Sequence, residues 1–293
     1  MIMYYINWDP IYKFPLWKGF FIHIYSLMFI ISFLLGWRFM KFLFRKENIS
    51  PIYLESLFIY TFFGTFIGAR LGQVFFYDFS YFSDHWIEVF FPVKENDHHY
   101  LLGIIKGYEF IGYRGLSSHG ATIGIILSNF FYNRKILKKS FIWLCDRLCI
   151  GVSLSAIFIR IGNFFNSEIV GKPCNPKLPF AVKFIQMDTE YGEVIPRHPT
   201  QIYESISYLL IFLLLWFFYN KKEKKIHDGF LSGIFFTLLW SVRFLLEFLK
   251  EPQGEEFIQF LSLNTGQCLS IPFIIFGLFL FNLDRIKKYF FWL

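Results

Sequence analysis

The chain has 293 residues, of which 55% are hydrophobic and 23% are aromatic, and its formal net charge is +7. A soluble protein of this size does not carry so much apolar and aromatic surface, so the composition argues for a membrane protein. The basic residues lie in short clusters between apolar runs. This placement is typical of membrane topology signals and argues against a nucleic-acid-binding protein.

Apolar runs long enough to cross about 30 Å of hydrocarbon recur along the whole chain. They predict an all-α polytopic membrane protein with seven transmembrane helices, at residues 19–40, 51–77, 116–132, 141–161, 200–219, 229–248 and 267–283. Six or eight spans remain alternatives. The first run lacks a small-residue cleavage site, so no cleaved signal peptide is expected. Residues 1–18 are rich in Tyr and Trp, which favour a membrane surface.

Basic clusters follow the first, third, fifth and seventh spans, and acidic or mixed loops follow the others. Because Lys and Arg concentrate on the cytoplasmic side, we expect the N-terminus in the periplasm and the C-terminus in the cytoplasm. We therefore expect one membrane-embedded domain, residues 1–293, with two long periplasmic loops. These are the arm region, residues 78–115, and the head region, residues 162–200, in which residues 180–185 could pair as a small sheet.

Polar side chains that are costly in a membrane gather at the outer ends of the predicted spans. The stretch 160–171 places a cation, two carboxamides and a carboxylate at the outer end of the fourth span. Others open the third and fifth spans or lie within the first, second and sixth. We expect the following side chains to meet in one outward-facing pocket: Tyr25, Arg70, His119, Arg160, Asn163, Asn166, Glu168, His198, Gln201, Tyr203, Glu204, Arg243 and Glu247.

Several of these residues also have a purely structural explanation. Arg243 and Glu247 are four residues apart and could form an ion pair on one helix face. Arg70 could pair with Glu204 or Glu55, and a histidine such as His119 could cap a helix. Independent structural roles would not all fall on one side of the membrane, so their convergence favours a binding pocket.

A membrane-embedded pocket that contains arginines predicts a phospholipid ligand. Guanidinium groups hold a phosphate by two parallel hydrogen bonds, and the surrounding apolar helices can accept acyl chains. The sequence contains no Cys-x-x-Cys motif, no metal-spaced His and Asp cluster and no glycine-rich nucleotide loop, so we expect neither a metal nor a cofactor.

Five segments resemble, in order and in spacing, the bacterial prolipoprotein diacylglyceryl transferases: residues 68–72, 118–120, 160–171, 197–204 and 243–248. The resemblance implies a bacterial inner-membrane enzyme. It would move the diacylglyceryl group of phosphatidylglycerol to the thiol of the lipobox cysteine in a prolipoprotein signal peptide, and glycerol 1-phosphate would leave.

The resemblance also implies roles for individual residues. Catalysis would rest on His119, Arg160, Arg243 and Glu247, with the two arginines on the lipid head group, and Tyr25, Asn163, Glu168 and Gly171 would bind substrate. From its place at the mouth of the expected pocket, we expect His119 to be the base or to orient one. The other expected substrate-binding residues follow from their place in that pocket: Arg70, Asn166, His198, Gln201, Tyr203 and Glu204. Leu239 stands where the family commonly has tyrosine, and residues 250–253 depart from its usual Arg-x-Pro-Asp.

Two other classes of function remain open from the sequence alone. A transporter or flippase for an anionic lipid would use the same arginines, but it should show two halves with paired broken helices. A structural membrane scaffold would not need the clustered Arg, His, Asn and Glu side chains.

Overall fold

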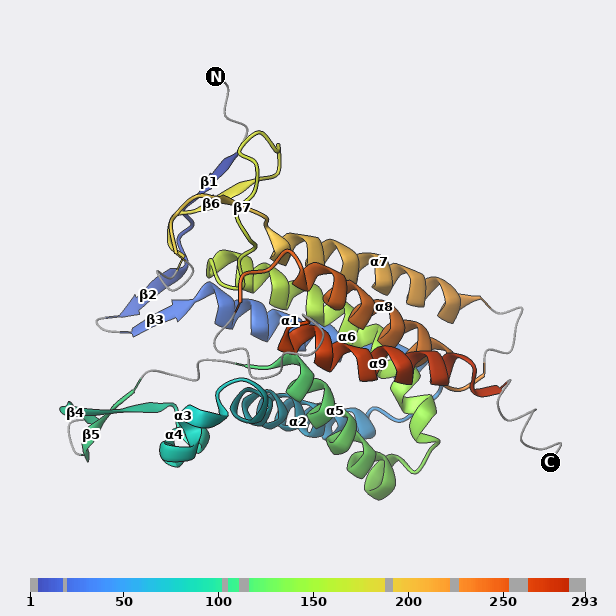
Figure 1. The fold of residues 1–293 in the computed structure, drawn as a ribbon. Coiled ribbons are helices and arrows are strands. Elements are labelled where there is room, and N and C mark those ends of the chain that lie inside the picture. The colour runs from blue at the N-terminus through green and yellow to red at the C-terminus, as the bar shows by residue number, and fades with distance from the viewer. Residues whose placement is uncertain are drawn as a thin grey trace. The chain divides into compact units, whose positions relative to one another are not determined.

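Figure 1 shows a computed structural model of the chain, which describes residues 5–17, 20–101, 105–110, 116–187, 192–221, 227–252 and 263–284. The expected basic clusters at 222–225 and 285–288, and the acidic residues Glu255 and Glu256, lie outside the described residues. The chain forms two compact units. The first comprises Met1–Leu54, Lys139–Gln253 and Leu269–Leu293, and the second comprises Glu55–Lys138 and Gly254–Cys268.

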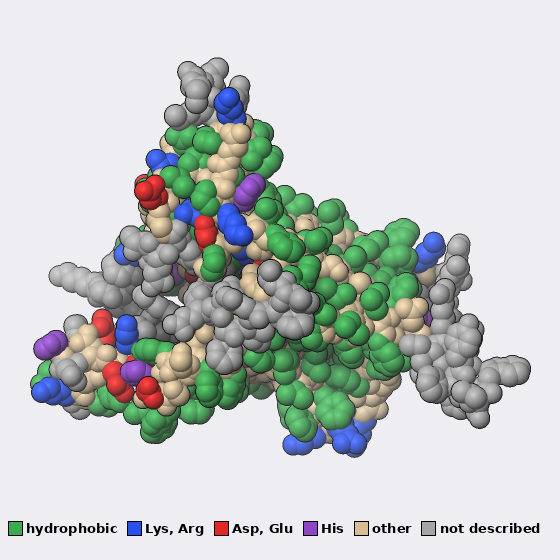
Figure 2. Space-filling model, viewed as in Figure 1, with side chains coloured by type: hydrophobic (Ala, Val, Ile, Leu, Met, Phe, Trp, Pro, Cys, Tyr) green, Lys and Arg blue, Asp and Glu red, His purple; other side chains and the backbone are tan. Residues whose placement is uncertain are grey.

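The helices of the first unit pack around α6 (Phe141–Phe165), which contacts α1 (Ile24–Lys46), α7 (Thr200–Asn220) and α8 (Phe230–Glu247). These helices are apolar on most of their circumference, so they bury one face against α6 and still expose large hydrophobic side chains. Hydrophobic side chains cover much of the helical surface in Figure 2. Such a surface is stable in lipid, and the polytopic all-α membrane fold is confirmed.

Five described helices are long and apolar enough to cross a membrane: α1, α2 (Ile52–Phe76), α6, α7 and α8. The other two expected spans are shorter, because α9 (Thr265–Phe281) has 17 residues and α5 (Ser118–Tyr132) has 15. At 1.5 Å per residue, α5 covers about 22 Å as a regular helix. It continues as a π-helix, η1 (Asn133–Leu137). The count of seven spans stays a prediction.

The expected start of the first span is wrong by several residues. Residues 20–23 form strand β3 (Phe20–His23), which pairs antiparallel with β2 (Lys13–Trp17). The helix begins only after His23, whose backbone is extended with ψ 139°. Hydropathy cannot separate an apolar strand from the first turn of an apolar helix, which explains the error.

The small sheet expected in the head region is confirmed, but one of its strands comes from the N-terminus. Strand β6 (Val182–Phe184) pairs antiparallel with β7 (Pro196–Arg197) and parallel with β1 (Ile6–Trp8). The sheet covers a small core that includes Val170. The indole of Trp8 donates a 3.0 Å hydrogen bond to the carbonyl of Phe164 in the last turn of α6. The N-terminal strand therefore braces the end of the helix that carries Arg160.

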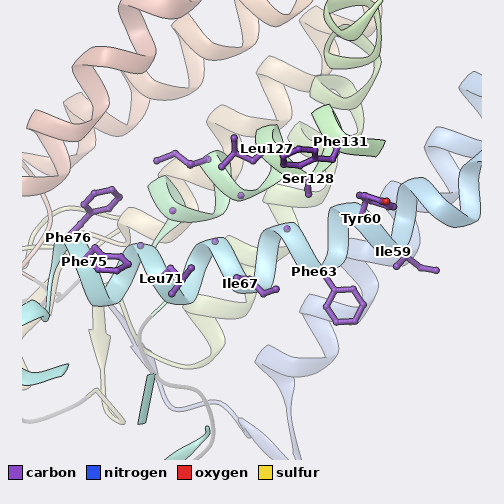
Figure 3. A pocket seen from close by; sticks show the side chains of 16 residues that line it. Ile59, Tyr60, Phe63, Ile67, Leu71, Phe75, Phe76, Leu127, Ser128 and Phe131 are labelled. Atoms are coloured by element: carbon purple, nitrogen blue, oxygen red, sulfur yellow. The ribbon is translucent and has the colours of Figure 1, made fainter. Parts of the chain in front are cut away.

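In the second unit, α2 and α5 approach so closely that only glycines fit between them. A Cβ on Gly68 or Gly124 would lie less than 3.0 Å from backbone atoms of the facing helix. Figure 3 shows the groove of about 580 Å³ beside this contact, with Phe63 and Ile67 from α2 and Leu127 from α5. The groove has no charged lining residue. It suits hydrocarbon, and it is not a headgroup site.

The arm region of the second unit contains two short helices, α3 (Phe79–Asp84) and α4 (Trp86–Phe90), and a β-hairpin. The hairpin strands are β4 (Val93–Leu101) and β5 (Ile105–Phe110). The arm exposes several large apolar side chains, including Trp86 and Phe90.

Candidate functional site

Three cations from two parts of the chain converge on the buried carboxylate of Glu204 in α7. Arg160 Nε from α6 lies 2.7 Å from Glu204 Oε2, and Arg243 Nη1 from α8 lies 3.5 Å from Oε1. Lys250, three residues beyond the end of α8, places Nζ 2.8 Å from Oε1. The Glu204 side chain is fully buried. A buried carboxylate is stable only when it is paired, and here three cations share it.

A chain of hydrogen bonds runs from this cluster to Glu168. Arg160 Nη1 donates to Asn163 Oδ1 at 3.1 Å, and Asn163 Nδ2 donates to Glu168 Oε1 at 2.6 Å. Burial raises the pKa of Glu168, while hydrogen bonds from Asn163 and Asn166 and the charge of Arg160 oppose the rise. The end of α6 and the loop after it thus join a guanidinium, two carboxamides and a carboxylate, as the sequence predicted.

The backbone around Glu168 has an uncommon conformation. Its neighbours Ser167 and Ile169 have left-handed φ values of 53° and 56°. A left-handed β-branched residue is strained, so its surroundings must hold it in place. Thr200 Oγ1 donates to the carbonyl of Ile169 at 3.0 Å, and Gln201 Nε2 donates to that of Glu168 at 2.6 Å. The first turn of α7 therefore fixes this loop.

Gly171 is required by a close backbone approach in the same loop. Its amide donates to the carbonyl of His198 at 3.1 Å, and a Cβ at this position would meet that carbonyl and the Cβ of His198. On the other side, Lys172 N donates to Leu249 O at 2.7 Å. The loop is thus held between the start of α7 and the segment after α8.

Tyr25, in the first turn of α1, also lies beside this loop. A Cβ on Gly162 would lie 3.0 Å from the Tyr25 ring, so the glycine lets the ring pack directly against α6. The Tyr25 hydroxyl interacts with Asn163. The structure therefore brings Tyr25 to the polar end of α6.

His198 and Tyr203 contact each other, with His198 Nδ1 3.3 Å from the Tyr203 hydroxyl. Tyr203 also packs edge-on against Phe180 of the head region. Burial lowers the pKa of His198, which favours its neutral form. These two residues contribute to the head region, whereas Gln201 and Glu204 of the same helix face the loop and the cations.

Two further candidates lie in the second unit. His119 is fully buried in the first turn of α5, and its Nδ1 lies 3.2 Å from the Tyr77 hydroxyl. Arg70 in α2 donates to the carbonyls of Glu88, at 2.5 Å, and Val89, at 3.2 Å, at the end of α4. Its guanidinium also lies 4.6 Å from the ring centroid of Phe82. Arg70 therefore anchors the arm region, while Glu204, its suggested partner, pairs with Arg160, Arg243 and Lys250.

Comparison with known proteins identifies the family. The model of the prolipoprotein diacylglyceryl transferase family matches residues 13–283. This chain belongs to that family. The phosphatidylglycerol–prolipoprotein diacylglyceryl transferase of Bacteroides fragilis is 38% identical over 97% of this chain and 96% of its own length. The same-named proteins of Porphyromonas gingivalis and Campylobacter lari are 36% and 32% identical, over 87% and 97% of this chain and 86% and 97% of their own lengths.

The family is one of transferases, so the cluster on Glu204 belongs to an enzyme. Sequence reasoning missed two of its members. Lys250 stands where the family pattern has arginine, three residues after Glu247, and its Nζ is 3.4 Å from Glu247 Oε2. Tyr208 lies one turn after Glu204 on α7 and hydrogen-bonds to Arg160. Lys250 follows Glu247 by three residues and Tyr208 follows Glu204 by four. This helical spacing is the sequence signal that could have identified both residues.

In this member of the transferase family, Asp146 links α6 to α8. Its carboxylate accepts hydrogen bonds from Gly229 N, at 2.9 Å, and from Ser232 N and Oγ, at 2.8 and 2.6 Å. These amides belong to the start of α8 and have no partner within the helix. Asp146 therefore caps α8 from α6 and fixes how far α8 is shifted along α6. This shift sets the position of Arg243 relative to Arg160.

Proposed function

We propose that this chain transfers the sn-1,2-diacylglyceryl group of phosphatidylglycerol to the lipobox cysteine of a prolipoprotein. The sulfur forms a thioether bond to the primary carbon of the diacylglyceryl group. The bond from that carbon to the phosphate oxygen breaks, and sn-glycerol 1-phosphate leaves with the bonding electrons. The thiol proton passes to a base. No metal or cofactor is needed for this displacement.

The observation that carries the proposal is the convergence of Arg160 and Arg243 on one carboxylate. Two guanidiniums that share a counter-ion lie close enough to act on one phosphate. As the ester bond breaks, the phosphate gains negative charge, and fixed cations in a site shielded from water stabilise that charge strongly. Arg160 and Arg243 would thus bind the head group and stabilise the leaving group.

We assign the base to His119, since a thiol attacks as thiolate and a free cysteine has a pKa of about 8.5. Glu247 would orient the cations through its contact with Lys250. Tyr25, Asn163, Asn166, Glu168 and Gly171 would shape the pocket around the head group. Gln201 and Glu204 would complete it from the start of α7. Arg70 would support substrate binding by anchoring the arm region, and His198 and Tyr203 by supporting the head region.

The proposed setting is the bacterial inner membrane, with the N-terminus in the periplasm and the C-terminus in the cytoplasm. The basic clusters after alternate spans support this orientation. The arm and head regions would then lie at the periplasmic surface, and we assign to them the guidance of the signal peptide. Trp86 and Phe90, exposed on the arm, suit an apolar partner.

Purified protein in detergent, supplied with phosphatidylglycerol and a lipobox peptide, tests the function. We expect release of glycerol phosphate in a one-to-one ratio with the lipidated peptide. A peptide in which serine replaces the cysteine should release none. Absence of release from the cysteine peptide, or equal release from both, would contradict the proposed transfer.

A further inference from the structure

Lys250 is a buried cation that lies beside Arg160 and Arg243 at the carboxylate of Glu204. Its side chain is 1% exposed, and its Nζ contacts both Glu204, at 2.8 Å, and Glu247, at 3.4 Å. An ammonium group is strongly hydrated in water, so burying it is costly unless opposite charges surround it. Here two carboxylates from two different helices do so.

The backbone of Lys250 is fixed as firmly as its side chain. Lys250 forms an isolated antiparallel bridge with Gly171, and Glu251 N donates to Val170 O at 3.1 Å. The ammonium therefore stands at the junction of α7, α8 and the loop that carries Glu168. The backbone contacts fix the point from which its side chain reaches the two carboxylates.

The charge of the cluster depends on this residue. Arg160, Arg243 and Lys250 are in direct ion-pair contact with Glu204 and Glu247, so these five groups together carry one positive charge. Glu168 is outside this count, because Asn163 lies between it and Arg160. Without Lys250, the two arginines would be neutralised by the protein's own carboxylates. A neutral cluster in a low-dielectric site attracts an anion far less than one with a net charge.

We propose that Lys250 is a positioning residue that neutralises one of the two carboxylates, so that the arginine pair keeps one positive charge for the lipid phosphodiester. The inference rests on the proposed function and deepens it. Lys250 acts through Glu204 and Glu247. The phosphodiester of phosphatidylglycerol carries one negative charge, which matches the single positive charge that the cluster retains.

Binding of phosphatidylglycerol to the purified protein, measured without a peptide substrate, tests this role. Lys250→Met should weaken binding about tenfold, equivalent to about 1.4 kcal/mol, because the cluster becomes neutral. Lys250→Arg should bind as the natural protein does. The matched control is Lys46→Met, which removes an exposed lysine that hydrogen-bonds to Asn220 at the other end of α7 and should leave binding unchanged.

A charge-restoring variant separates this role from simple packing. Lys250→Met combined with Glu247→Gln returns the net charge to one and should recover most of the lost affinity, although the lysine stem is still missing. If Lys250→Met does not fold, Glu247→Gln alone provides the test. Removing this negative charge makes the net charge of the cluster more positive by one, which should tighten binding of the lipid.

Unchanged binding by Lys250→Met would overturn the proposal. So would a double variant that binds no better than Lys250→Met, or a Glu247→Gln variant that binds no tighter than the natural protein. Because binding is measured without transfer, failure of the transferase assay and failure of this charge series are distinguishable.

Discussion

Arg160 and Arg243 contact the two oxygens of one buried carboxylate, with Arg160 Nε 2.7 Å from Glu204 Oε2 and Arg243 Nη1 3.5 Å from Oε1. Their helices are therefore joined near one end by Glu204 and near the other by Asp146, which caps α8 from α6. These two contacts set the distance between α6 and α8 and the shift of one helix along the other. The positions of the two guanidiniums are thus a property of the whole bundle.

Replacing Arg243 by lysine should abolish most of the activity. A lysine keeps the charge but loses the planar fork that can hold a phosphate by two hydrogen bonds. A hydrogen bond to a charged group contributes about 1.5–3 kcal/mol, so turnover should fall about tenfold to a hundredfold. Release of glycerol phosphate is the measurement.

Arg147→Lys is the matched control for Arg243→Lys, because Arg147 pairs with Glu47 at 2.9 Å near the opposite end of α6. This variant should keep nearly full activity. If Arg243→Lys were as active as this control, the role of Arg243 would be structural only.

Glu204→Gln should destabilise the protein strongly. Loss of the negative charge leaves Arg160, Arg243 and Lys250 buried together, and removing one partner of a buried ion pair costs about 3–5 kcal/mol. Thermal unfolding in detergent measures the loss. Glu47→Gln, at a partly exposed pair, should cost less than about 1 kcal/mol. Equal melting temperatures for the two variants would show that Glu204 does not hold the cluster.

His119→Gln should reduce turnover by about a hundredfold or more, the range expected when a general base is lost. Tyr77→Phe, which removes the hydroxyl 3.2 Å from Nδ1 of His119, should cause a smaller loss. Both can be assayed in membranes that contain equal amounts of each protein. Near-normal turnover by His119→Gln would remove this residue from the role of base.

Gly171→Ala should lower activity sharply, because the added Cβ would meet the His198 carbonyl and displace the loop that carries Glu168. Gly151→Ala in α6 is the control, since its nearest contact would be Met40 at 3.5 Å, an ordinary packing distance. That variant should be active and at least as stable, because alanine favours a helix. Equal activity of the two variants would mean that the loop adapts to the larger side chain.

Shortening the β4–β5 hairpin should raise the KM for the lipobox peptide and leave the KM for phosphatidylglycerol unchanged, if the arm region guides the signal peptide. Replacing residues 97–106 with a two-residue Asn-Gly turn would shorten it and keep Asn96 opposite Gly107, which preserves a favoured hairpin connection. Steady-state kinetics with each substrate varied in turn give both values. An unchanged peptide KM would argue against this role for the arm region.

Composition and residue spacing alone predicted the membrane class, the approximate positions of the apolar helices and the gathering of polar residues at their ends. These follow from local composition, because an apolar run needs lipid and an ionisable side chain within it is costly unless it has a partner. The motif at 160–171 was also readable, since Asn163, Asn166 and Glu168 interact within one turn and the following loop.

Which charged side chains pair with one another could be seen only in the folded structure. Glu204 had several possible partners in the sequence, including Arg70, yet it pairs with Arg160, Arg243 and Lys250. The pairing of β1 with β6 and the capping of α8 by Asp146 were likewise not readable. Such contacts depend on how each helix is rotated and how far it is shifted along its neighbours. That geometry is set by packing over the whole bundle, which no local pattern records.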